Sequence, residues 1–101
     1  MVGKDNPRLQ IVAVEPADSF KKGQWMVVSL TEGEQLRVYV ECAKLIGPVW
    51  HLLGMVTSVL VPGYSARWAE DYENHRVLII IGRHGWLRLA EERTADVTRT
   101  E

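Results

Sequence analysis

The feature that most constrains this fold is a long uncharged run in the middle of the chain. From Leu45 to Ala66 there is no Asp, Glu, Lys or Arg. A run of this kind has to be buried, either in a protein core or in a lipid bilayer. The segment 45–61 is at the short end of what crosses a bilayer as a helix, and it is interrupted by Gly47–Pro48, His51 and Gly54. We therefore predict burial in a protein core and no membrane segment.

The uncharged run is compatible with two kinds of secondary structure. As a helix, it would have Pro48 in its first turn and would stop at Pro62–Gly63. As a strand, residues 55–61 are rich in Val and Thr, and Gly54 would lie where a long strand bends. The flanking segments favour the strand, but strand or helix for 48–61 stays open from the sequence.

Length and composition predict one small domain. The chain has 101 residues, of which 47% are apolar and 25% are charged, as in an ordinary globular protein. We expect a domain over residues 8–92, a flexible leader at 1–7 and a polar tail at 93–101. The net charge of −1 gives no support for binding to duplex nucleic acid or an anionic membrane. The single cysteine, Cys42, and the charges near the N-terminus predict a cytoplasmic protein.

The first half of the chain reads as three strands. Residues 8–15 form the first, and Phe20 in the following connection is expected to contact the core. Residues 24–31 and 35–42 read as a hairpin with a two-residue turn at Glu32–Gly33. This register predicts one apolar face, consisting of Trp25, Val27, Leu36, Val38 and Val40.

The second half reads as a short helix near residues 66–73 and a hairpin of 76–82 with 86–92. A loop of two or four residues at Gly82–Gly85 sets a register that groups Leu78 and Ile80 with Leu87 and Leu89. Because both faces of 76–82 are apolar, this strand is predicted to be central or at an interface. The fold class expected is mainly β, with α+β at the margin: a small antiparallel barrel or rolled sheet of five to six strands with one short helix.

Tryptophan is unusually frequent, with four residues in the chain. We predict that Trp25 and Trp50 pack in the core. Aromatic residues interleaved with Arg in the segment 64–76 can instead hold a ligand or a partner, although the segment could also be an amphipathic connector that caps the core. The predicted recognition surface consists of Tyr64, Arg67, Trp68, Tyr72, His75, Arg76, Trp86 and Arg88.

Catalytic and metal chemistry find little support in the sequence. The spacing of His51, His75 and His84 matches no zinc motif, and we predict neither a metal nor a cofactor. Cys42 and His51 could in principle form part of a thiol hydrolase, but no neighbouring motif supports this. A pocket containing His51 and Trp50 is the one catalytic or ligand-binding alternative.

Three functional hypotheses remain, with the first preferred. It is a small non-enzymatic binding or assembly module that forms homo-oligomers through an aromatic-rich surface, with another protein or a small ligand as a further possible partner. The second is a single-stranded nucleic-acid-binding domain, because three strands, a helix and two strands is the element order of an OB-type barrel. The third is a small enzyme or ligand-binding protein that uses the histidine pocket.

Overall fold

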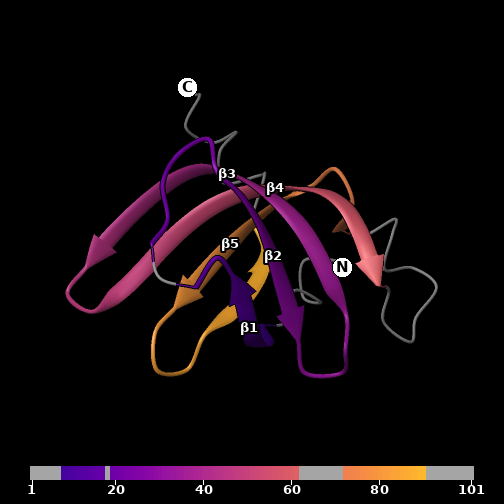
Figure 1. The fold of residues 1–101 in the computed structure, drawn as a ribbon, viewed down its shortest axis with the longest axis horizontal. Helices are drawn as coiled ribbons and strands as arrows, with labels where there is room; N and C mark the ends of the chain where they lie inside the picture. The colour runs from indigo at the N-terminus through magenta and orange to yellow at the C-terminus, as the bar shows by residue number, and fades with distance from the viewer. Residues whose placement is uncertain (1–7, 18, 62–71, 91–101) are drawn as a thin grey trace.

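The chain folds into a closed antiparallel β-barrel. The computed structural model describes residues 8–17, 19–61 and 72–90, and each strand pairs with the next in sequence until the sixth returns to the first (Figure 1). This confirms the predicted small, mainly-β barrel. The strands are β1 (Leu9–Glu15), β2 (Trp25–Leu30), β3 (Gln35–Ile46), β4 (Val49–Val61), β5 (Arg76–Ile81) and β6 (Trp86–Leu89).

The sequence also predicted a helix near 66–73 and the element order of an OB-type barrel. The predicted helix near 66–73 lies outside the described residues except for its last two positions, Tyr72 and Glu73. The sequential order of antiparallel neighbours also differs from the Greek-key order of an OB barrel. The similarity in element order therefore did not extend to topology.

The barrel interior is filled with aliphatic side chains from alternate positions of the strands, as expected for a barrel of this size. Two buried aromatic residues, Phe20 and Tyr72, reach the core from the connections, which confirms the expected role of Phe20. The inward-facing strand residues with the least exposure are Met26, Val28, Leu36, Val38, Val40, Leu52, Val56, Val77, Ile79 and Leu87.

The described part of the uncharged run forms the end of β3, a turn and the whole of β4. Its predicted burial is wrong at the start of the run, where Leu45 and Ile46 are exposed. β4 extends without a break from Val49 to Val61, so the helical alternative is wrong for these residues. Only one face of β4 is buried in the interior; the other is half-exposed around the middle of the strand. Gly47–Pro48 forms the tight turn between β3 and β4, with Gly47 at a φ of 61° and Ile46 paired with Val49. β3 is consequently longer than predicted and forms with β4 the long hairpin seen in Figure 1.

The register of the β2–β3 hairpin differs from the prediction by one residue. Val28 pairs with Leu36, and Leu30 N–H donates to the carbonyl of Glu34, so three residues form the loop instead of two. Gly33, with a φ of 93°, occupies the third loop position, where a left-handed residue is usual. Met26 and Val28 therefore point inward, and Trp25 and Val27 point outward.

The β5–β6 hairpin shows the same kind of difference. Ile79 pairs with Leu87 and Ile80 pairs with Trp86, which leaves an odd number of residues between the last paired positions. The predicted grouping of Leu78 and Ile80 with Leu87 is therefore wrong. Leu78 and Ile80 share the outer face with Trp86 and Arg88, and Leu87 is fully buried.

Candidate functional site

The outer surface of β4, β5 and β6 carries apolar side chains where a solvated barrel surface would carry polar ones. Strand pairing places them in rows across the three strands: His51, Ile80 and Trp86 form one row, and Leu53, Leu78 and Arg88 form the next. We call this surface the outer wall. It consists of His51, Leu53, Met55, Leu78, Ile80, Trp86 and Arg88, all of them half-buried.

The outer wall is also free of acidic residues. Neither β4 nor the segment 76–89 contains Asp or Glu, whereas that segment contains Arg76, Arg83 and Arg88. Among the described residues, Glu41 of β3 pairs with Arg76 at the border of the wall: its Oε1 accepts a hydrogen bond of 2.8 Å from Nε of Arg76. The wall is therefore an apolar surface with basic residues at its border.

Two guanidinium groups lie close to the indole ring of Trp86. The guanidinium carbon of Arg8, at the start of β1, lies 4.3 Å from the ring centroid, and that of Arg88 lies 5.7 Å from it. Both distances are within the range of cation–π attraction. Nε of Arg88 is buried and makes no hydrogen bond.

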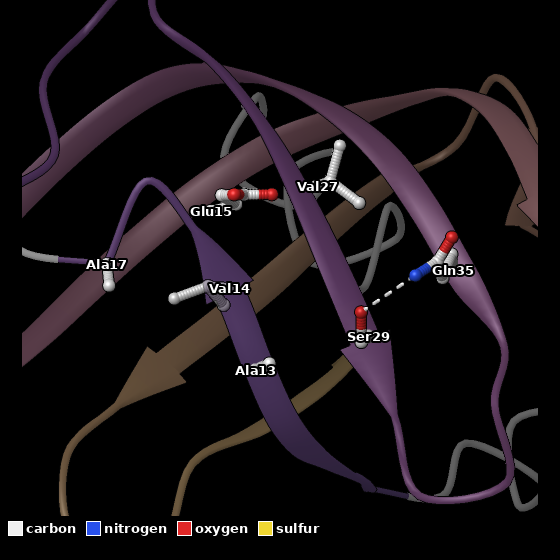
Figure 2. Close-up of a pocket in the computed structure, with 7 residues that line it drawn as sticks. All are labelled: Ala13, Val14, Glu15, Ala17, Val27, Ser29 and Gln35. Carbon is white, nitrogen blue, oxygen red and sulfur yellow. Dashed lines mark hydrogen bonds between the residues drawn. The ribbon is translucent and has the colours of Figure 1, made fainter.

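A shallow groove lies on the other side of the barrel, over β1, β2 and β3. Its volume is about 350 Å³, and Figure 2 shows the small side chains and the single carboxylate that line it. Nε2 of Gln35 donates a hydrogen bond of 3.3 Å to Oγ of Ser29 along its border. The lining residues are Ala13, Val14, Glu15, Ala17, Val27, Ser29 and Gln35.

The residues of the predicted pocket, His51 and Trp50, are neighbours on β4. Being consecutive residues of a strand, they point to opposite faces. Trp50 contacts the core and makes an edge-to-face contact with Phe20 at 5.4 Å, whereas His51 lies on the outer wall with a buried Nδ1 that has no hydrogen-bond partner. Within the part of the chain that the structure describes, no three His, Cys, Asp or Glu side chains are grouped as metal ligands.

The residues of the predicted recognition surface have different locations. Tyr64, Arg67 and Trp68 lie outside the described residues. Tyr72 is 7% exposed and belongs to the core. His75 is exposed, with its Nδ1 3.0 Å from the carbonyl oxygen of Glu73. The structure brings Trp86 and Arg88 together on the outer wall.

Sequence reasoning missed Arg8 and the apolar residues of the outer wall. It also missed an exposed aromatic pair on β2 and β3. Trp25, 48% exposed, contacts Tyr39 at a centroid distance of 5.1 Å, and the guanidinium of Arg37 lies 4.6 Å from the Trp25 ring. The apolar sequence of β2 does not distinguish its two faces, and the assumed two-residue turn assigned Trp25 to the wrong one.

Among residues 8–17, 19–61 and 72–90, no helix has the length and apolar character needed to cross a membrane. No family model matches this sequence, and the searches of curated proteins and of solved structures also found no match.

Proposed function

We propose that this chain is a small non-enzymatic binding or assembly module and that the outer wall is its contact surface. The observation that carries the proposal is the outward orientation of Leu53, Leu78 and Ile80, with Leu53 of β4 paired with Leu78 of β5. Contiguous apolar surface is rare on proteins that act alone and is typical of contact surfaces. The aromatic and Arg residues at its border, Trp86 and Arg88, are types enriched at interfaces.

The partner we propose is a second copy of the chain, bound head to tail. The wall lacks carboxylates, so charge complementarity disfavours packing one wall against another wall. The groove over β1–β3 carries Glu15, and in a closed ring of six strands β2 lies opposite β5. A contact between the wall of one copy and the groove of the next uses two different surfaces, and such a contact forms rings or open chains.

The test is the oligomeric state of the full chain, measured by size-exclusion chromatography with light scattering. Leu53→Lys places a charge in the centre of the wall without touching the interior, and its basic neighbours offer it no counter-ion. We expect this variant to be monomeric at concentrations where the wild type is assembled. Leu45→Lys is the matched control, because Leu45 is 53% exposed but lies on the other face of the β3–β4 hairpin.

A mixing experiment tests the head-to-tail arrangement. Ala13→Lys changes the groove and leaves the wall intact, so it should also be monomeric by itself. When it is mixed with Leu53→Lys, each variant retains the surface that the other lacks, and the mixture should form a 1:1 dimer and nothing larger. A monomeric wild type would refute the assembly proposal. An assembled wild type without dimer formation in the mixture would refute the head-to-tail arrangement.

A second candidate function is binding of single-stranded nucleic acid at Trp25, Arg37 and Tyr39. The supporting observation is the exposure of both aromatic rings beside a guanidinium group, since bases stack on such surfaces. Addition of an oligonucleotide should then quench tryptophan fluorescence, with an effect that weakens with salt and is lost in Trp25→Ala. Equal quenching of the wild type and Trp25→Ala would exclude this site.

A further inference from the structure

Arg8 and Arg88 are neighbours across the seam that closes the barrel. β1 and β6 pair through Leu9 with Leu87 and Gln10 with Trp86. Continuing this register by one residue places Arg8 opposite Arg88. Because Leu87 points into the barrel, both Arg residues and Trp86 are on the outer side, in agreement with the two guanidinium–indole contacts.

This arrangement is unfavourable without a negatively charged partner. Like charges on directly opposite positions of neighbouring strands destabilise a sheet. Within the part of the chain that the structure describes, no carboxylate compensates for the two charges: β4, β5 and β6 contain no Asp or Glu, and no ion pair forms with Arg8 or Arg88. The buried Nε of Arg88 is in addition a donor without an acceptor, and a buried donor left unsatisfied has an energetic cost.

We infer that Arg8, Trp86 and Arg88 form a binding site for an oxyanion, either a carboxylate or a phosphate group. A guanidinium group that stacks on an indole is held in orientation and still presents N–H groups at its edge. Two such groups on adjacent strands can donate several charge-assisted hydrogen bonds to one oxyanion. A nucleobase fits less well, because the guanidinium groups already occupy space over the Trp86 ring that a stacked base would need.

The site lies at the edge of the outer wall that meets β1, and it does not require self-assembly. A free phosphate ion and a carboxylate from a protein partner, including Glu15 of a neighbouring copy, would be recognised by the same chemistry. These two sources differ in their effect on assembly. A neighbouring copy's carboxylate would be displaced by phosphate, so phosphate would dissociate the oligomer, whereas an independent anion site would bind phosphate without changing the oligomeric state.

The experiment is a calorimetric titration of the full-length protein with inorganic phosphate, and separately with succinate, at constant ionic strength. We expect Arg88→Gln and Arg8→Gln each to weaken phosphate binding at least tenfold. The matched control is Arg83→Gln, which also removes one positive charge but from the exposed β5–β6 turn and not from beside Trp86. It should change phosphate binding less than twofold. Arg8 is exposed, so Arg8→Gln keeps the test valid if Arg88→Gln fails to fold.

Three outcomes would overturn the inference: wild-type protein that binds neither phosphate nor succinate, variants Arg8→Gln and Arg88→Gln that bind as the wild type does, or an equal loss in Arg83→Gln. The last result would indicate a diffuse effect of positive charge. Light scattering with and without phosphate then identifies the source of the oxyanion. Because Leu53→Lys leaves these residues in place, anion binding by that variant would separate the site from the assembly proposal.

Discussion

Replacement of Gly54 by Ala tests how closely β3 and β4 approach each other. Gly54 is buried in the middle of β4, opposite Val40 of β3 and Val77 of β5. A Cβ atom at this position would overlap Cγ1 of Val38 and would lie 3.0 Å from the backbone oxygen of Tyr39. β3 has irregular register on both sides of this point, between Arg37 and Val38 and between Val40 and Cys42.

The stability cost of Gly54→Ala depends on whether the neighbouring atoms can move away from the added methyl group. Val38 is fully buried, so its methyl group cannot turn into solvent, and overpacking of this kind costs about 1–3 kcal/mol. The contact with the Tyr39 oxygen cannot be relieved by a rotamer change, which places the cost at the upper end. Ala gains about 0.5–1 kcal/mol over Gly in a strand because it restricts the unfolded chain more. We therefore expect Gly54→Ala to lose about 2 kcal/mol of unfolding free energy, or a Tm lower by about 10 °C.

Urea denaturation followed by tryptophan fluorescence, at a fixed protein concentration, measures this loss. Gly82→Ala is the matched control, because its Cβ would contact only the side chain of Val49, at 3.3 Å, and should cost less than about 1 kcal/mol. In the double variant Gly54→Ala with Val38→Ala the overlap is removed, and the two effects should couple by about 1 kcal/mol or more. A Gly54→Ala protein as stable as the wild type, or strictly additive effects in the double variant, would refute the close approach of the two strands.

Two further predictions test the register and the surface charges. Trp25→Ala should lower the free energy of unfolding by less than about 1 kcal/mol, because the indole is on the outside. Met26→Ala should lower it by about 2–5 kcal/mol, because the Met26 side chain is fully buried. If urea denaturation shows a larger loss for Trp25→Ala than for Met26→Ala, the β2–β3 register is wrong. Glu41→Gln should change the unfolding free energy by no more than about 0.5 kcal/mol, since both partners of the Glu41–Arg76 ion pair are partly exposed; a loss of several kcal/mol in the same assay would contradict this.

The fold class could be predicted from the sequence because it depends on features that a small shift does not change. β-branched residues, apolar runs and Gly or Pro between them identified most of the strands. The uncharged length of β4 predicted burial, which the structure shows for its inward face. The extension of β3 to Ile46 was missed although Gly47–Pro48 is a turn dipeptide. That dipeptide was interpreted within the uncharged run and not as its boundary.

The candidate site was harder to predict because it depends on which side of each strand faces outward. In β2 and β5 nearly every residue is apolar, so the composition of the strand does not distinguish its two faces. The assignment then rests on the loop, and a change of one residue in the loop exchanges the faces. Both hairpins were predicted with an even number of loop residues, and both have an odd number. Trp25 was consequently placed in the core, and Leu78 was grouped with the buried Leu87.

Comparison of the two sides of the barrel indicates that folding alone does not require an apolar outer wall. The outward positions of β2 and β3 include the polar residues Ser29 and Arg37 beside Trp25, Val27 and Tyr39, and the barrel accommodates them. The equivalent outward positions of β4 and β5 are occupied by Leu53, Leu78 and Ile80. The same strand geometry thus accepts polar residues on one side, so the apolar, carboxylate-free composition of the other side needs a reason outside the barrel interior. The contact that we propose would supply that reason, because burial in an interface stabilises outward apolar side chains in the way that the core stabilises inward ones.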